Sequence, residues 1–130
     1  MKRHAALLQL SREHHHALKL SRLARFASDA NHALAIAEAA EKIIEAFPEV
    51  LEPHFRSEET DLLPALAAAG AIELVERTLA EHAELRELNR RLVEPDSEIL
   101  ARFATLLHDH VRFEEREVFE TAQQLLYAEH

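Results

Sequence analysis

The sequence predicts an all-α protein, an antiparallel up-down four-helix bundle. Among its 130 residues there are one Gly and four Pro, while Ala, Leu and Glu are abundant, and this composition favours helix almost throughout. Aromatic and β-branched residues are scarce, so a sheet would be difficult to build. Apolar side chains recur with helical spacing in four stretches that are joined by short turns.

A short polar stretch separates the first two helices. We expect the first helix to begin after Ser11, a suitable N-cap, and to end near Ala27. The second helix follows and ends at Gly70, a natural C-cap. Pro48 and Pro53 lie within this second helix and should kink it or divide it in two.

The last two helices are separated by a proline-containing turn. The third helix should run from about Ile72 to Val93, and the fourth from a cap at Asp96 or Ser97 to Leu125. Apolar residues expected to face the core are Leu18, Leu20, Leu23 and Phe26 in the first helix and Leu74, Val75, Leu79, Leu85, Leu88 and Leu92 in the third.

Length, charge and cysteine content exclude several classes of protein. A chain of this size fits one domain spanning residues 1–130. The formal net charge of −9 argues against a basic nucleic-acid-binding face, and the absence of cysteine excludes disulfides, zinc–thiolate sites and iron–sulfur clusters. No stretch approaches the ~20 apolar residues needed to span a membrane. We therefore expect a soluble cytoplasmic protein with no nucleic-acid or membrane partner.

Two stretches share the pattern His-x-x-x-Glu-Glu followed by an apolar pair, and they are HFRSEETDLL at 54–63 and HVRFEEREVF at 110–119. Helix positions i and i+4 are about 40° apart, so the His and the first Glu of each stretch point the same way. The second Glu lies about 100° further round and should fall outside the core. These inward-facing pairs are candidate metal ligands: His54, Glu58, His110 and Glu114.

The other two helices each carry a histidine in a related setting. In the third helix, His82 lies against the apolar stripe. In the first helix, three successive histidines sweep about 200°, so they cannot all face the core. His14 lies four residues from both Leu10 and Leu18 and is favoured, while His15 lies three residues before Leu18 and remains an alternative.

Inward-facing Glu and His from all four helices are the materials of di-metal sites in helical bundles. Left unpaired in a core, such groups would be costly, and their mixture suits iron, manganese or zinc. In a chain with ten histidines a lone His-x-x-x-Glu pair would mean little, but the doubled-Glu form occurs twice. The competing readings are an ordinary buried histidine for His82 and surface i,i+4 pairs for the others.

These motifs resemble the hemerythrin-like, His-His-Glu cation-binding family. They occur in the family's order and cover all four helices: LSREHHHAL at 10–18, HFRSEETDLLPAL at 54–66, LAEHAEL at 79–85 and HVRFEEREVF at 110–119. The resemblance implies a non-haem di-iron centre in the core of the bundle. It makes Glu58 and Glu114 the bridging carboxylates, and it makes the terminal ligands His54, His82, His110 and either His14 or His15.

The sequence departs from the oxygen-carrying members of that family at two positions. Those proteins have His-x-x-x-His in the third helix, but Thr78 stands four residues before His82. They also have Asp five residues after the His of the fourth helix, where this chain has Glu115. Fewer histidine ligands would leave an open iron position, which favours sensing, storage or iron handling over stable oxygen carriage.

We therefore expect a protein that binds or senses oxygen, nitric oxide or a related small oxidant such as peroxide at two iron ions, or that handles iron. A binding role is preferred to catalysis, although a di-iron peroxidase- or oxidase-like enzyme remains an alternative. The sequence shows no evident pocket for an organic substrate, and it identifies no protein partner. A metal-free helical interaction module is the third hypothesis.

Overall fold

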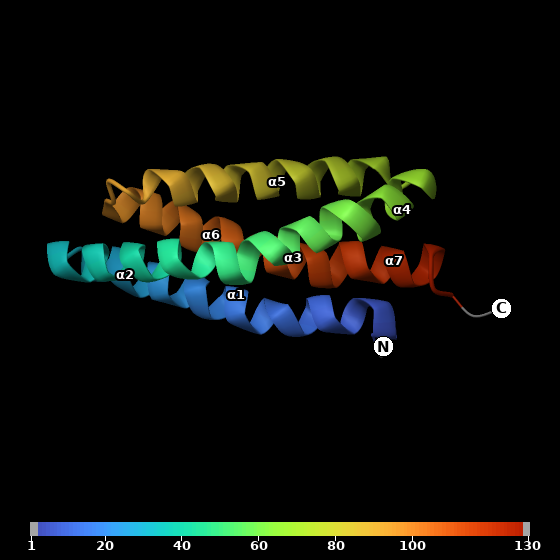
Figure 1. Cartoon of the computed structure of the whole chain (residues 1–130), viewed down its shortest axis with the longest axis horizontal. Helices are drawn as coiled ribbons and strands as arrows, with labels where there is room; N and C mark the ends of the chain where they lie inside the picture. Colours follow the sequence, from blue (N-terminus) through green and yellow to red (C-terminus); the bar gives the residue numbers. More distant parts are fainter. Residues whose placement is uncertain (1–2, 129–130) are drawn as a thin grey trace.

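The computed structural model describes residues 3–128, and within that range it contains four long helical segments and no strand (Figure 1). Residues 1, 2, 129 and 130 of the predicted domain lie outside this range. The first segment is α1 (Ala5–Ala30), and the third is α5 (Ile72–Arg91). The second consists of α2 (Ala33–Ala46), η1 (Phe47–Leu51), α3 (Glu52–Ser57), η2 (Glu58–Leu62) and α4 (Leu63–Ala68). The fourth consists of α6 (Ser97–Phe113), η3 (Glu114–Val118) and α7 (Phe119–Leu125). Successive segments run in opposite directions, which confirms the antiparallel four-helix bundle.

Two of the expected caps are confirmed. Gly70 has the positive φ of 98° that ends a helix, and the amide of Ala71 donates to the carbonyl of Leu66 at 2.9 Å. These two features form a Schellman motif, which satisfies the last carbonyls of α4. Asp96 caps α6 because its carboxylate accepts a hydrogen bond from the amide of Ile99 at 2.8 Å.

α1 extends beyond both of its expected ends, and the prediction of Ser11 as its N-cap is wrong. His4 is the cap, since its Nδ1 accepts a hydrogen bond from the amide of Ala6 at 3.0 Å. Ser11 lies within the helix, and its hydroxyl donates to the Glu115 carboxylate instead. At the other end the chain leaves the helix at Asn31, which has the left-handed φ of 48°.

The second segment bends at its prolines but remains continuous. Pro48 lies in the π-helical turn η1, where the amide of Glu52 donates to the carbonyl of Phe47, five residues earlier. Pro53 follows directly and has no backbone N–H to donate, so the wider turn lies where regular helical bonding is interrupted. The segment changes direction near α3 and then crosses toward α5 (Figure 1).

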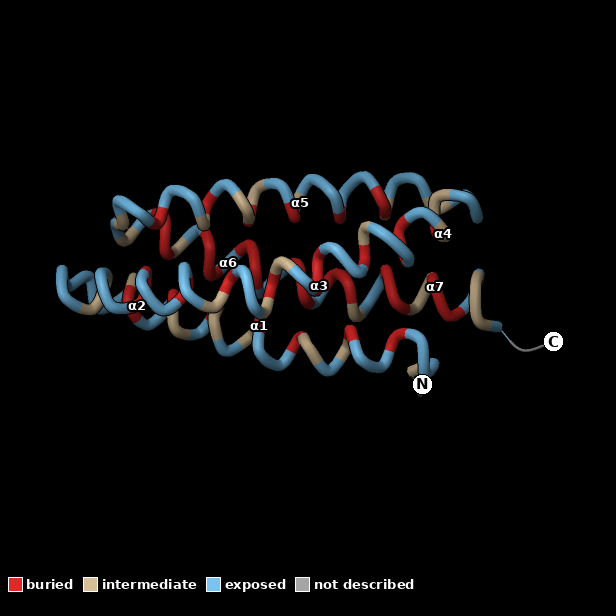
Figure 2. Tube along the Cα trace, viewed as in Figure 1, coloured by how far each residue is buried: buried red, intermediate tan, exposed pale blue. Residues whose placement is uncertain are grey.

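The buried residues lie on the inside of the bundle along its whole length (Figure 2). They form two apolar clusters, one toward the α1–α2 turn and one toward the termini. The first includes Ile43, Leu51, Phe55, Leu100 and Phe103, and the second includes Leu7, Leu62, Leu66, Val118 and Phe119. Each of the four segments carries buried polar residues close to the point where one cluster gives way to the other.

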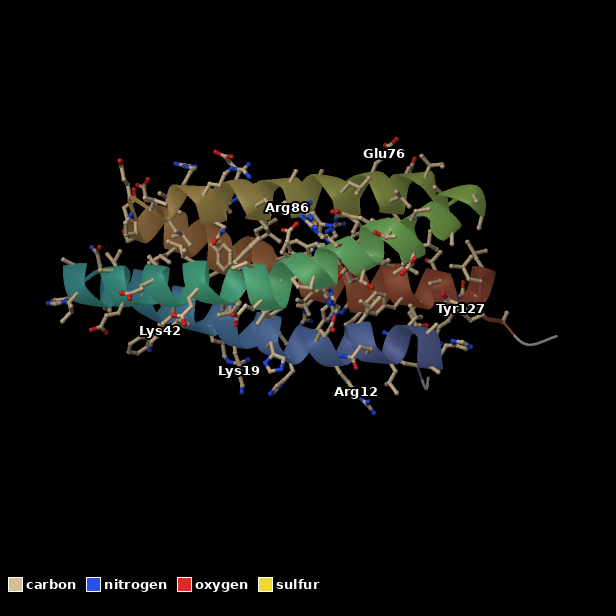
Figure 3. All side chains as sticks on the ribbon, in the orientation of Figure 1. Arg12, Lys19, Lys42, Glu76, Arg86 and Tyr127 are labelled. Atoms are coloured by element: carbon tan, nitrogen blue, oxygen red, sulfur yellow. The ribbon has the colours of Figure 1, made fainter. Side chains whose placement is uncertain are left out.

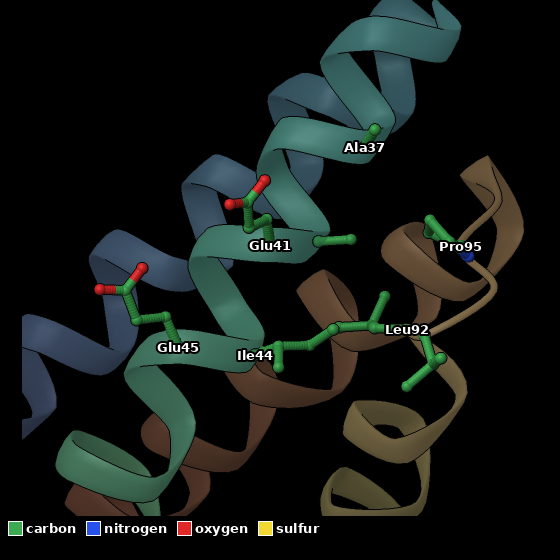
Figure 4. A pocket seen from close by; sticks show the side chains of 8 residues that line it. Ala37, Glu41, Ile44, Glu45, Leu92 and Pro95 are labelled. Atoms are coloured by element: carbon green, nitrogen blue, oxygen red, sulfur yellow. The ribbon is translucent and has the colours of Figure 1, made fainter.

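Some residues predicted to be in the core are exposed instead. Phe26 is 73% exposed and Leu79 is 43% exposed, because each lies at the edge of its apolar face and has no neighbouring segment to cover it. At the far end of the bundle from the termini, Ile44 and Leu92 line a surface pocket of about 480 Å³ between α2 and the α5–α6 turn (Figure 4). No helix within residues 3–128 is long and apolar enough to cross a lipid bilayer.

Replacing Asp96 with Ala should lower the free energy of unfolding by about 1 kcal/mol, because the amide of Ile99 loses its capping acceptor. Urea denaturation followed by circular dichroism measures the change. Asp29→Ala is the control, since Asp29 is exposed in the last turn of α1, where its charge opposes the helix dipole, and its removal should not lower stability. Equal stability of the two variants would show that the cap contributes nothing.

Candidate metal centre

Six buried polar side chains from all four segments meet between the two apolar clusters, and none is more than 5% exposed. They form two groups of four whose potential ligand atoms all lie within 4.8 Å of one another. One group is His14, His54, Glu58 and Glu114, and the other is Glu58, His82, His110 and Glu114. The two carboxylates belong to both groups, so the geometry matches two adjacent cation positions that share a pair of carboxylates.

The four imidazoles present the same nitrogen, Nε2, to these two carboxylates. The Nε2 atom of His14 lies 2.8 Å from Glu114, and that of His82 lies 3.0 Å from Glu58. His54 Nε2 lies 3.4 Å from Glu58 and 3.6 Å from Glu114, and His110 Nε2 lies 3.4 Å from Glu114. All of the imidazoles therefore point into one small volume that carries the negative charge of the two carboxylates.

Most of these converging atoms lack a well-formed hydrogen bond. The buried atoms without a partner include both carboxylate oxygens of Glu58, Oε2 of Glu114 and the Nε2 atoms of His54, His82 and His110. Leaving so many polar atoms unsatisfied in a core is costly. A cation coordinated by imidazole nitrogen and carboxylate oxygen would satisfy them, so the residues present fit a metal site.

A second set of carboxylates binds the opposite side of each imidazole. Every Nδ1 donates to a carboxylate at 2.7 to 2.8 Å, in the pairs His14–Glu115, His54–Glu13, His82–Glu59 and His110–Glu81. We call Glu13, Glu59, Glu81 and Glu115 the outer carboxylates. Because a carboxylate accepts the Nδ1 proton, the lone pair used for a metal is placed on Nε2, and the ring is fixed in orientation.

The sequence-based prediction underestimated the second Glu of each Glu-Glu pair. Glu59 and Glu115 were expected outside the core, and they do lie outside both groups, with side chains 24% and 30% exposed. Each nevertheless binds an imidazole on a neighbouring segment, because a residue adjacent to an inward-facing Glu points sideways along the bundle. The doubled Glu was the signal that could have identified this role.

The other two outer carboxylates also lie next to an inward-facing residue in the sequence, in this case a histidine. Glu13 directly precedes His14, and Glu81 directly precedes His82. Each reaches the imidazole of the segment that follows its own in the chain. The pattern Glu-His on one helix and His-x-x-x-Glu-Glu on the next therefore produces a closed ring of contacts with approximate twofold repetition.

Of the two helix-1 candidates, the structure brings His14 to the cluster and leaves His15 exposed beside His16. The ring of His14 stacks on Phe119, with ring centres 5.3 Å apart. Thr78 is fully buried, but its hydroxyl donates to the carbonyl of Leu74 at 2.7 Å, so it turns toward its own helix. Thr78 belongs to neither of the two groups.

Both shared carboxylates stand at the first position of a π-helical turn, Glu58 in η2 and Glu114 in η3. Pro64 follows η2 closely, but no proline follows η3, so proline is not the common cause. π-turns inside α-helices occur frequently at functional sites, where they redirect side chains. The shared position in both turns links this backbone irregularity to the placement of the two carboxylates.

Without a bound cation, the buried groups strongly influence each other's protonation. Burial alone would lower the pKa of His54, but the close Glu114 and Glu58 carboxylates outweigh it and raise the pKa to about 11. His110 behaves alike: the attraction of Glu114 overcomes burial and raises its pKa to about 10. Burial and the nearby charge of Glu114 raise the pKa of Glu58. These imidazoles are thus protonated near neutral pH and must release protons to bind a metal.

Binding of a divalent cation at neutral pH should release protons, and affinity should rise with pH, because ligation requires the deprotonated Nε2 atoms. In the metal-free protein, the stability of the fold changes with pH in the opposite direction and falls as the pH rises. The pKa values of His54 and His110 are raised from 6.5 to about 11 and about 10, so their contribution to stability is complete below pH 6.5 and disappears as the pH rises through those values. Calorimetry in buffers of different ionisation enthalpy measures the protons, and denaturation with chelator present measures the stability.

Neither proton release nor a loss of metal-free stability at alkaline pH would be seen if these imidazoles were neutral in the folded protein. The same calorimetric titration on His54→Gln is the control, because one of the protonated groups is then absent. It should release fewer protons per ion bound than the unaltered chain.

Glu81→Ala should lower metal affinity about 10- to 100-fold, since His110 loses the partner that orients its ring. Competition with a chromophoric chelator measures the affinity. Glu84→Ala is the matched control, because Glu84 lies on the same helix but pairs with Arg102 at the surface. Unchanged affinity in Glu81→Ala would show that the outer carboxylates do not support the centre.

Comparison with known proteins agrees with this geometry. Residues 6–122, most of the chain, match the family model described as the hemerythrin HHE cation binding domain. Neither the curated proteins nor the solved structures give a significant match. The matched range includes all six clustered residues and all four outer carboxylates. The resemblance drawn from the motifs is confirmed, and the chain belongs to the hemerythrin HHE cation-binding domain family.

Proposed function

We propose that this protein holds two iron ions in its core and uses them to bind or sense oxygen, nitric oxide or a related small oxidant, or to handle iron. The observation that carries the proposal is the pair of four-residue groups that share Glu58 and Glu114. A shared pair of carboxylates is what a two-metal centre needs and what a single cation does not require. Membership of a cation-binding family supports it independently.

In this proposal each ion has two imidazoles of its own and shares both carboxylates with its neighbour. His14 and His54 hold one ion, and His82 and His110 hold the other. Mixed imidazole and carboxylate ligands suit iron, manganese or zinc. The family resemblance favours iron, with manganese or zinc as possible substitutes.

The bound iron would supply the electrons and the coordination position for the small ligand. The chain itself provides geometry and protection. The outer carboxylates fix the imidazole rings, and the two apolar clusters exclude bulk water on both sides. Thr78 adds no ligand, because its hydroxyl is bonded within α5. Fewer protein ligands leave room for an external ligand, which supports sensing or iron handling over stable oxygen carriage.

Anaerobic loading with ferrous iron should give two irons per chain, measured by elemental analysis, and the electronic spectrum should change on exposure to oxygen. Glu58→Ala should reduce the content of both ions because it removes a ligand common to both groups. Glu117→Ala is the control: Glu117 lies in η3 beside Glu114 but is 56% exposed. A folded, helical wild-type protein that retains neither iron nor manganese would refute the proposal.

A further inference from the structure

The four outer carboxylates differ in whether a cationic side chain binds them. Three of them form an ion pair with an arginine, in the pairs Glu115–Arg3 at 3.1 Å, Glu59–Arg86 at 2.9 Å and Glu81–Arg77 at 3.0 Å. Within residues 3–128, no ion pair with Lys or Arg is formed by Glu13. Its second oxygen accepts a hydrogen bond from the uncharged side-chain amide of Gln9 at 3.1 Å. One of the four positions is therefore held less firmly than the others.

The arginines close the half of the centre that contains His82 and His110. Arg86 donates to both Glu52 and Glu59 and lies over the ring of Phe55, filling the space between α5 and α3 (Figure 3). Arg77 stacks on Phe113 at 3.7 Å from the ring centre. All four imidazoles are buried, so the two halves differ in the arginines beside their outer carboxylates and not in the burial of the rings.

Glu13 lies at a surface pocket, and none of the other outer carboxylates lines that pocket. Its volume is about 360 Å³, it lies between α1 and the η1–α3 region, and its lining residues are Gln9, Arg12, Glu13, His16, Glu49, Val50 and Pro53. One oxygen of Glu13 accepts from His54 Nδ1 at 2.8 Å while the side chain borders the pocket. We call this the Glu13 pocket. A single side chain separates it from one of the clustered imidazoles.

The Glu13 pocket carries side chains that attract cations, but it is not itself a metal site, because among residues 3–128 only the two buried groups bring three or more potential ligands close together. Glu13 and Glu49 supply carboxylates and His16 supplies an imidazole, which are ligand types for divalent transition metals. Arg12 also lines the pocket, but its side chain extends away from the bundle into solvent (Figure 3). The chain as a whole carries a formal charge of −9, so a cation is attracted to this concave surface.

We propose that divalent metal ions enter and leave the centre through the Glu13 pocket, with the Glu13 carboxylate as the last group before His54. This inference rests on the proposed metal centre. To open the route, Glu13 need break only a hydrogen bond from the uncharged Gln9 amide besides its bond to His54, whereas each other outer carboxylate would also have to break an ion pair with arginine. The ion held by His14 and His54 loads first and exchanges faster than its neighbour.

Glu49 offers the sharpest test, because it lines the pocket and touches none of the six clustered residues. We expect Glu49→Gln to slow the uptake of Mn²⁺, followed by stopped-flow, by roughly three- to tenfold, and Glu49→Lys to slow it further. A residue that borders only the route affects uptake and release alike, so the equilibrium affinity stays close to that of the wild type. Glu13→Gln should slow uptake and also weaken binding, because it supports His54 directly.

The matched control is Glu45→Gln. Glu45 is exposed on the same helical segment but lines the pocket at the far end of the bundle (Figure 4), so its variant should take up Mn²⁺ at the wild-type rate. Wild-type rates in both Glu49 variants would overturn the route while leaving the metal centre intact. A wild-type protein that binds no metal at all would overturn the proposed function itself, so the two failures are distinguishable.

Discussion

Two carboxylates facing each other in the middle of an apolar core are the constraint on which this structure depends. Glu58 and Glu114 are fully buried, and their negative charges could not remain together in a low-dielectric interior without compensation. The four imidazoles supply it by directing their Nε2 atoms at the carboxylates, and a pair of cations would supply it more completely. Each helical segment contributes at least one member, so satisfying this charge also fixes how the four segments align along the bundle.

The outer carboxylates extend that organisation from the core to the surface. Each one fixes the ring of an imidazole on another segment, and three of the four are fixed in turn by an arginine. From the core to the surface, the successive layers are the shared carboxylates, the imidazoles, the outer carboxylates and the arginines. Such layering restricts the positions of potential ligands before any metal binds, which reduces the reorganisation that binding requires.

The departure from twofold repetition at Glu13 gives the two halves of the centre different surroundings at the surface. The half with His82 and His110 lies beneath Arg86 and Arg77, while the half with His14 and His54 borders a polar pocket. The two ions would have the same types of ligand but different surroundings, so their rates of exchange would differ.

The sequence by itself determined the helical class, the turns at Gly70 and Asp96 and the inward direction of His54, Glu58, His82, His110 and Glu114. These follow from composition, capping chemistry and the 3.6-residue period, which act over a few neighbouring residues. Only the tertiary structure showed that His14, and not His15, lies in the buried cluster, and that Phe26 is exposed. It also showed that each outer carboxylate binds an imidazole on another segment. Helical spacing specifies which way a side chain points, but its partner depends on the rotation and offset of the packed neighbouring helix, which no local pattern encodes.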